Sequence, residues 1–245
     1  MSLLSTLTSD SSIADEKDII GGSRVLNSDL YNFKVVHAYV TKSDGGAVGL
    51  VLNLKNDAGQ ELRQSLWMTS GTAKGCKNYY EKDGERHYLP GYIMANALCL
   101  LTVGKEISQL ETEQKVIPVY NNEAKGEIPT KVEMLTDLLG QEISAGVIKQ
   151  KVDKTKKNPT TGVYEPTGET REENEIDKFF RTRDRMTTAE IRAKAETAAF
   201  ADTWIAKWQG KERDRSKGAA AAGTAGLPNK PAATAAAKPT TSLFG

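Results

Sequence analysis

The sequence has few of the side chains that catalysis and metal binding use most often. It contains two histidines, His37 and His87, and two cysteines, Cys76 and Cys99. Two histidines leave little for an imidazole-based triad or metal site, and the cysteine spacing fits neither a zinc site nor a disulfide framework. We therefore expect free thiols in a reducing setting, no metal and no cofactor.

Catalytic sequence motifs are missing as well. There is no HExxH, GxSxG or GxxxxGK[ST], and the nearest approach, Gly71–Lys77 (GTAKGCK), has the wrong glycine spacing and lacks a Ser or Thr after its lysine. Neighbouring carboxylates such as Glu172 and Glu173 lie in an exposed acidic run, where solvation explains them. The sequence predicts that the protein is not an enzyme.

Long apolar runs and a strong charge bias are also lacking. The longest apolar stretch, Ala97–Val103, is too short to cross a bilayer, and the start of the chain lacks the basic and apolar regions of a signal peptide. Both favour a cytosolic protein without membrane contact. The net charge of +1 argues against duplex binding driven by counterion release alone, but it permits a local basic groove.

What the sequence does contain is a series of β-strand patterns. Tyr31–Lys42 is rich in β-branched and aromatic residues, and apolar side chains alternate over residues 48–54. Asn56–Gly59 supplies turn residues, so the next strand, Glu61–Thr69, should return as a hairpin. Further elements are expected as strands over residues 116–120, 128–135 and 143–152 and as a short helix over residues 92–104. The fold class is therefore mainly β.

The third strand carries two side chains suited to binding an unpaired nucleic acid. Leu62, Leu66 and Met68 share one face, and Arg63 and Trp67 share the other. If the leucine face packs inward, the open face holds a ring for stacking and a cation for phosphate. The alternative is that a C-terminal helix covers this face and that Trp67 belongs to the core.

The loop after this strand interleaves cations with tyrosines. Ammonium groups follow phosphates while aromatic rings stack on unpaired bases, so this composition suits a single strand. Tyr92, at the entrance of the predicted helix, should pack instead. The competing interpretation is that the tyrosines cover the edge of a sheet. The nucleic-acid contacts expected in this loop are Lys74, Lys77, Tyr79, Tyr80 and Lys82.

A second basic segment follows the last predicted strand. The turn residues 158–162 reverse the chain after it, and the acidic segment 169–177 could be the return strand that pairs with the lysines when no ligand is bound. This indicates a protruding basic hairpin, although a solvated hairpin tip is the common alternative. The lysines expected to contact nucleic acid are Lys149, Lys151, Lys154, Lys156 and Lys157.

The composition also suggests how the chain is divided. Thr187 and Glu190 fit a capping box, and apolar residues recur from there at helical spacing up to Gly210. Leu243-Phe244, in the last four residues SLFG, are expected to be a small apolar hook for a partner protein. The expected parts are a disordered segment 1–22, a β-domain 23–180, an amphipathic helix with a solvated charge run 181–217, and a disordered Ala/Gly/Pro/Lys tail 218–245.

Several segments resemble those of a known family. They are DIIGG (18–22), NSDLY (27–31), WMT (67–69), NYY (78–80), LPG (89–91), LCLL (98–101), PTKV (129–132), LTDLLG (135–140), KQKVDK (149–154), GETREEN (168–174) and SLFG (242–245). In these segments the chain is similar to single-stranded DNA-binding proteins of short-tailed lytic phages.

That resemblance implies a fold and a function. The fold would be an OB-like five-stranded β-barrel, to which the sequence patterns above add an inserted short helix, a basic hairpin arm, a C-terminal helix and a disordered tail. The protein would coat single-stranded DNA without sequence preference during phage replication and recombination, in the cytoplasm of the infected host cell. Its tail would contact replication or transcription proteins. One departure is that residues 218–245 contain no Asp or Glu, whereas many replicative proteins of this kind end in an acidic tail.

These expectations combine into one hypothesis. A barrel formed between residues 31 and 152 presents Arg63 and Trp67, while the tyrosine loop and the lysine arm close over the DNA from two sides. The alternative class is a non-enzymatic protein–protein adaptor or transcription co-regulator built on a β-domain. RNA in place of DNA, and the oligomeric state, stay open.

Overall fold

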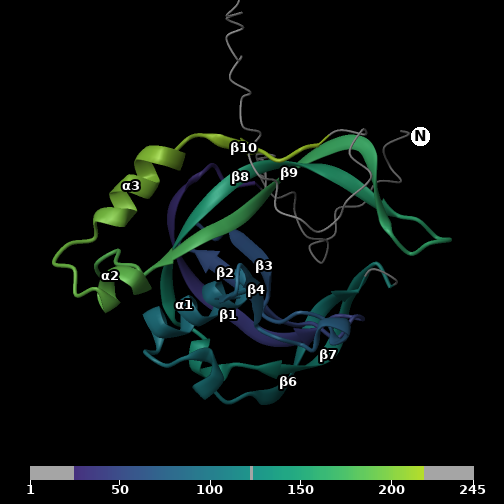
Figure 1. The fold of residues 1–245 in the computed structure, drawn as a ribbon, viewed down its shortest axis with the longest axis horizontal. Coiled ribbons are helices and arrows are strands. Elements are labelled where there is room, and N and C mark those ends of the chain that lie inside the picture. Colours follow the sequence, from purple (N-terminus) through teal and green to yellow (C-terminus); the bar gives the residue numbers. More distant parts are fainter. Residues whose placement is uncertain (1–24, 122–123, 218–245) are drawn as a thin grey trace, which may run out of the picture. The chain divides into compact units, whose positions relative to one another are not determined.

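The computed structural model describes residues 25–121 and 124–217. As predicted, the fold is mainly β, with a large antiparallel sheet (Figure 1). The strands are β1 (Asp29–Lys42), β2 (Val48–Asn56), β3 (Glu61–Trp67), β4 (Tyr79–Lys82), β5 (Glu85–Tyr88), β6 (Glu113–Asn121), β7 (Gly126–Met134), β8 (Glu142–Lys157), β9 (Tyr164–Phe180) and β10 (Glu212–Asp214). The helices are α1 (Pro90–Thr102), α2 (Thr188–Arg192) and α3 (Ala199–Trp208), with short 3-10 turns at 72–74, 107–109 and 136–138.

The chain divides into two compact units. The described part of the first unit comprises residues 25–121, 124–150 and 172–213, and that of the second comprises residues 151–171 and 214–217. The expectations for the N-terminal segment 1–22 and for the tail 218–245, including the hook Leu243-Phe244, concern residues outside the described ones. None of the described helices has the length and apolar character that a membrane span requires.

The main sheet of the first unit has the order β10-β8-β1-β2-β3. The predicted hairpin between β2 and β3 is confirmed, because Gly59 has φ 79° and the Asn56 N–H donates to the Gln60 carbonyl at 3.0 Å. On its other edge β1 pairs with β8, from Asp29 opposite Val147 to Lys34 opposite Glu142.

One hydrophobic core lies on one face of this sheet. Phe33, Leu52, Leu98, Ile143 and Phe179 are buried there, from β1, β2, α1, β8 and β9. α1 begins with Pro90 at its first position, where a missing N–H costs nothing. The predicted helix over residues 92–104 is confirmed in type, and it covers the leucine face of β3.

A smaller cluster covers part of the opposite face. The β6–β7 hairpin contributes Ile117, Val132 and Met134, which pack with Tyr39 of β1 and Val51 of β2. The middle of β2 is therefore buried on both faces, whereas the alternating pattern predicts one buried face. The two predicted strands that form this hairpin are confirmed as β6 and β7.

Strand pairing leaves the sheet open at β3. Among the described residues β3 pairs with β2 alone, and β9 pairs with β8. Where a barrel would close, the Ile176 N–H of β9 donates to the Gln64 side-chain oxygen of β3 at 2.7 Å. The strand pairing therefore does not show a closed five-stranded barrel, although this hydrogen bond connects β9 to β3.

The C-terminal part departs from the prediction of one long helix. The capping box of Thr187 and Glu190 is present, but it starts only the short helix α2, and a second helix, α3, follows. Glu190 accepts a hydrogen bond from the Phe200 N–H at 2.8 Å, and Phe200 stacks 6.2 Å from Phe180. These tertiary contacts turn the chain after α2, so that α2 and α3 are two separate helices.

The charged run after α3 is mostly exposed, as the sequence predicts, but part of it forms a strand. Residues 212–214 form β10, which pairs with β8. Arg213 donates to the Gln150 side chain at 2.7 Å and forms ion pairs with Glu175 and Asp177. Arg213 is therefore paired with carboxylates of β9.

The second unit is built on the β8–β9 hairpin, as predicted for the lysine arm. Its turn is closed by the Asn158 N–H, which donates to the Val163 carbonyl at 2.8 Å. The backbone N–H of Lys217 donates to Asp153 at 2.8 Å, and that of Arg215 donates to the Lys151 carbonyl at 2.9 Å. Residues 214–217 are thus bonded along the start of the arm.

Candidate functional site

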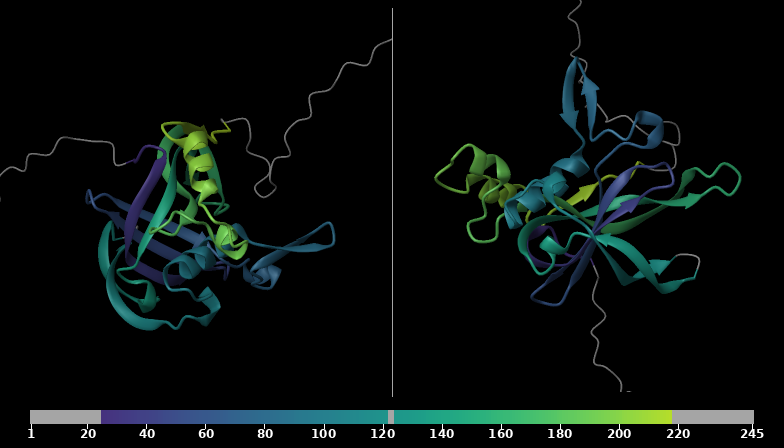
Figure 2. Two further views of the ribbon diagram at one scale, coloured as in Figure 1. Left: turned by 90° about the vertical axis from the view of Figure 1, so that its left-hand side faces the viewer. Right: turned by 90° about the horizontal axis from the view of Figure 1, so that it is seen from below.

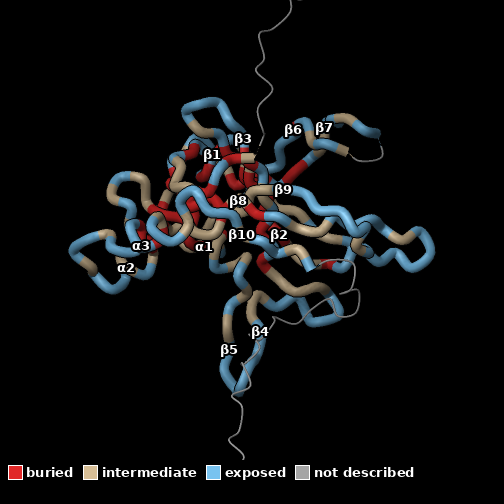
Figure 3. The backbone as a smooth tube through the Cα atoms, turned by 90° about the horizontal axis from the view of Figure 1, so that it is seen from above, coloured by how far each residue is buried: buried red, intermediate tan, exposed pale blue. Residues whose placement is uncertain are grey.

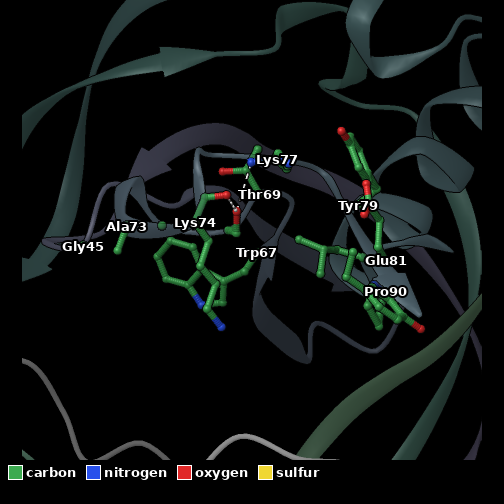
Figure 4. A pocket seen from close by; sticks show the side chains of 13 residues that line it. Gly45, Trp67, Thr69, Ala73, Lys74, Lys77, Tyr79, Glu81 and Pro90 are labelled. Atoms are coloured by element: carbon green, nitrogen blue, oxygen red, sulfur yellow. Dashed lines mark hydrogen bonds between the residues drawn. The ribbon is translucent and has the colours of Figure 1, made fainter. Parts of the chain in front are cut away.

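A surface hollow of about 760 Å³ lies in the first unit, between the end of β3, the 69–77 loop and β4. Figure 4 shows Trp67 and Lys74 on one side of it and Tyr79, Glu81 and Pro90 on the other. It is lined by five of the predicted contact residues, Trp67, Lys74, Lys77, Tyr79 and Tyr80. Residues that are separate in the sequence are brought to one place.

Trp67 stands on the open face of the sheet. Leu62, Leu66 and Met68 are buried, while 44% of Trp67 is exposed. α3 packs elsewhere, since a Cβ on Gly146 of β8 would lie 2.7 Å from the Trp204 ring. The alternative in which a C-terminal helix covers Trp67 is therefore wrong.

The backbone of β2 supports one side of the Trp67 ring. Gly49 is the register partner of Trp67, and a Cβ on Gly49 would lie 2.8 Å from Cε3 and 3.0 Å from Cζ3. A Cβ on Gly91 would lie 2.1 Å from the Trp67 carbonyl oxygen, so the first turn of α1 lies directly against this backbone. Gly49 thus supports the indole and Gly91 packs against the Trp67 backbone, so the ring is a preformed stacking surface.

The 69–77 loop that carries Lys74 and Lys77 is tied to its surroundings. The Thr72 N–H donates to the Gly45 carbonyl at 2.8 Å, and a Cβ on Gly71 would lie 2.6 Å from that same oxygen. The Lys77 N–H donates to the Ser70 hydroxyl at 2.9 Å. Both lysine side chains are exposed, and across the described residues neither forms an ion pair with a carboxylate.

The segment that follows is a β-hairpin and not the loop expected from the sequence. β4 and β5 pair from Tyr79–Tyr88 to Lys82–Glu85 and form their own two-stranded sheet. Asp83 and Gly84 form the turn, with φ 55° and 81°. Figures 2 and 3 show this hairpin projecting from the first unit with mostly exposed residues. An Asp-Gly pair is a strong hairpin signal, which our interpretation of the sequence overlooked.

The two predicted tyrosines of this hairpin differ in their surroundings. Tyr79 lies between two cations, with Lys77 Nζ 5.5 Å and Arg86 Cζ 4.9 Å from its ring centre. Tyr80 is 46% exposed and lies 5.5 Å from the His87 ring. Tyr80 is the more open ring, while Tyr79 holds the cations near the hollow. Arg86 and His87 were not among the predicted contacts.

Tyr92 packs, as predicted. It contacts the main core from the first turns of α1 and lies 4.8 Å from Tyr88. Burial raises the pKa of its hydroxyl. Tyr88 is 55% exposed and covers this ring from outside.

Two predicted contacts of the first unit lie away from the hollow. Arg63 is exposed further along β3, where its guanidinium donates to the Tyr39 hydroxyl at 3.4 Å. Lys82 is exposed next to the turn of the β4–β5 hairpin. Neither lines the hollow.

The predicted lysines after residue 148 have different environments. Lys149 belongs to the first unit, is 17% exposed, and pairs with Glu212 and with Glu172 at 3.1 Å. Hydrogen bonds to Glu212 and Glu172 raise the pKa of its ammonium group. In the second unit Lys154 pairs with Glu169 at 2.9 Å. The remaining arm lysines, Lys151, Lys156 and Lys157, are exposed.

Several residues that shape the hollow escaped the sequence analysis. Gly49 and Gly91 position Trp67, and Gly46 and Gly71 let the 69–77 loop approach the β1–β2 turn. One signal was available, because a glycine inside a strand often marks a close approach.

The hollow offers rings for stacking and cations for pairing with anions. It combines exposed aromatic rings with cations, and within residues 25–121 and 124–217 no three His, Cys, Asp or Glu side chains come together as a metal site. Cys76 and Cys99 are both free thiols.

In comparisons with known proteins, no family model matches this chain and no curated protein matches it.

Proposed function

We propose that this protein binds single-stranded DNA without sequence preference and is not an enzyme. The observation that carries the proposal is the grouping of Trp67, Tyr79 and Tyr80 with Lys74 and Lys77 around one hollow. The sequence alone predicts stacking and phosphate contact for these residues, and exposed rings and cations gathered at one surface support that prediction.

The physical basis is stacking combined with charge. Every base has a flat face, so a base stacked on Trp67 or Tyr80 contributes roughly 1–3 kcal/mol whatever its identity. Lys74 and Lys77 would neutralise phosphates on either side and add a salt-dependent increment. A near-neutral net charge of +1 is compatible with this, since the cations are concentrated locally.

The arrangement of strands supports an OB-like barrel as the scaffold. β3, β2, β1, β8 and β9 are consecutive neighbours, and the Ile176–Gln64 hydrogen bond lies at the position of closure. OB-folds bind oligonucleotides on the face of their second and third strands. Trp67 on β3 and Gly49 on β2 occupy that face of this sheet.

The biological setting is proposed from the resemblance to phage proteins. The protein would act during phage DNA replication and recombination in the cytoplasm of the infected host cell. Its C-terminal residues, Leu243-Phe244 in particular, would contact replication or transcription proteins.

One observation favours the adaptor as a second candidate. Val116 and Tyr120 of β6 are 61% and 58% exposed and lie on the same face of the β6–β7 hairpin. Apolar side chains grouped on one hairpin are typical of a protein-contact surface.

Tryptophan fluorescence with oligo(dT) tests the proposal, at two salt concentrations. We expect strong quenching that weakens with salt and that is largely lost in Trp67→Phe. Trp204 is buried, so Trp204→Phe is the matched control and should keep the quenching. Unchanged fluorescence and unchanged anisotropy of labelled oligo(dT) at low salt would favour the adaptor.

A further inference from the structure

The lysine arm carries an aromatic side chain that the proposed site does not use. Tyr164, the first residue of β9, is 65% exposed, the highest fraction among the exposed large hydrophobic side chains of the described residues. Within the part of the chain that the structure describes, no aromatic ring or cation lies against it. A ring so placed contributes nothing to a core.

Tyr164 borders a hollow of about 650 Å³ within the second unit. Its wall also contains Lys154 and Arg171, two cations, and the hydroxyl side chains of Thr155 and Thr167. The Thr167 hydroxyl donates to the Lys154 carbonyl at 3.2 Å, which ties the two strands of the arm together at this point. Aromatic ring, cations and hydroxyl groups are the components of a nucleotide contact.

One of the two cations of this hollow, Lys154, forms an ion pair with a carboxylate in the free protein. Glu169 lies 2.9 Å from the Lys154 ammonium group, with 71% and 47% of their side chains exposed. The hydrogen bond from Lys154 lowers the pKa of Glu169. Exposed ion pairs contribute little to stability, so a phosphate can replace this carboxylate at small cost.

We propose that the arm holds a second nucleotide-binding site, in which a base stacks on Tyr164 and its phosphate takes the place of the Glu169 carboxylate on Lys154. Arg171 adds positive charge to the same hollow. Glu169 then acts as an internal competitor that weakens binding to the arm. This inference rests on the proposed function and adds a residue and a regulatory contact to it.

The test uses the full chain and fluorescence anisotropy with labelled oligo(dT). Tyr164→Leu keeps apolar bulk in the strand but removes the stacking ring, and it should weaken binding at least about fivefold. Tyr164→Phe keeps the ring and should bind like the wild type. Val163→Ala, at the neighbouring exposed position, is the control and should change nothing.

Glu169→Gln tests the competitor. Removing its charge leaves Lys154 open, so affinity should rise and the slope of log K against log salt should steepen by about 0.7, the value for one phosphate on a single strand. Ultraviolet crosslinking to an iodouracil-containing oligonucleotide should label Tyr164, and mass spectrometry identifies the peptide.

The outcomes separate the two proposals. If Trp67→Phe loses quenching while Tyr164→Leu and Glu169→Gln bind like the wild type, the arm site is wrong and the function of the first unit stands. If the wild type does not bind oligo(dT), both are wrong. If Tyr164→Leu and Tyr164→Phe weaken binding equally, the hydroxyl and not stacking is responsible, and the proposed contact is overturned.

Discussion

The benzene edge of the Trp67 indole lies over Gly49, so closely that a Cβ on residue 49 would stand 2.8 Å from the ring. The two residues face each other across β2 and β3. The direction in which the ring points is therefore decided by a residue that has no side chain.

Gly49→Val should displace the indole from this position. We expect affinity for oligo(dT) to fall by about five- to 150-fold, the range for one lost stacking contact. Ser65→Val is the matched control, because Ser65 is exposed on the same face of β3, two residues before Trp67. Fluorescence titration gives the affinities and circular dichroism checks folding. Wild-type affinity in folded Gly49→Val would contradict the role of the Trp67 platform.

Lys74 and Lys77 should act through charge alone. In the double variant Lys74→Gln, Lys77→Gln we expect the salt slope to become shallower by about 1.4, from 0.7 for each of two phosphates on a single strand. Lys55→Gln serves as control, since Lys55 is already paired with Glu61 at 3.1 Å. Filter binding over a range of salt concentrations measures the slope. An unchanged slope in the double variant means that the phosphates lie elsewhere.

The arm lysines should divide into two groups. Replacing Lys154, Lys156 and Lys157 together by glutamine should flatten the salt slope, because these side chains are exposed. Lys149→Gln should leave the slope unchanged and lower the melting temperature, because it leaves the Glu172 and Glu212 carboxylates without their shared cation. Calorimetry and salt titration of both variants distinguish the groups. A flattened slope in Lys149→Gln would show that this lysine exchanges its carboxylates for phosphate.

The two thiols should react at very different rates. Burial raises the pKa of Cys99 to about 12, so only about one in ten thousand of these thiols is ionised at pH 8. Cys76 is exposed in the 69–77 loop. Iodoacetamide followed by mass spectrometry should label Cys76 in the native protein and both residues in denaturant. Oligo(dT) should slow the labelling of Cys76, and equal rates with and without it would argue against binding at the hollow.

Stability should fall in acid partly through Asp184. A hydrogen bond from Arg181 lowers the pKa of this carboxyl in the folded protein, so its contribution is present above its unfolded pKa and is lost as pH falls through the folded value. Asp184→Asn should lower the free energy of unfolding by roughly 0.5–1 kcal/mol at pH 7. The difference from wild type should shrink below about pH 4, near the usual pKa of Asp. Urea titrations at pH 3 and pH 7 measure it, and a constant difference would contradict the assignment.

The outward direction of Trp67 could be predicted because strand alternation is local. Leu62, Leu66 and Met68 define the buried face without knowledge of the rest of the fold. The position of Gly49 beneath the ring could not be predicted, because it depends on the register in which β3 pairs with β2. Gly49 becomes meaningful only once it is paired with Trp67.

The differences between the predicted and the observed C-terminal part also come from contacts that the local sequence does not reveal. Helical spacing from Thr187 onward is a real signal, but Glu190 binds the backbone of Phe200 and the chain turns between them. The charged run 211–217 is mostly exposed, and the sequence does not show that Arg213 within it contacts Gln150 and Glu175. Contacts between distant segments decide both cases. The β4–β5 hairpin differs, since its Asp83-Gly84 turn was a local signal.

The pairing of β1 with β8 has a consequence for the order of folding. β1, β2 and β3 can assemble as soon as they are synthesised, because their hairpins are local. The other edge of β1 must wait for β8, as the hydrogen bond between Ser144 and Asn32 spans 112 residues. Contacts so distant in sequence slow folding, and an unpaired strand edge favours aggregation in the meantime. We therefore expect fragments that end before β8 to be aggregation-prone, and the nascent chain to depend on its later half for protection.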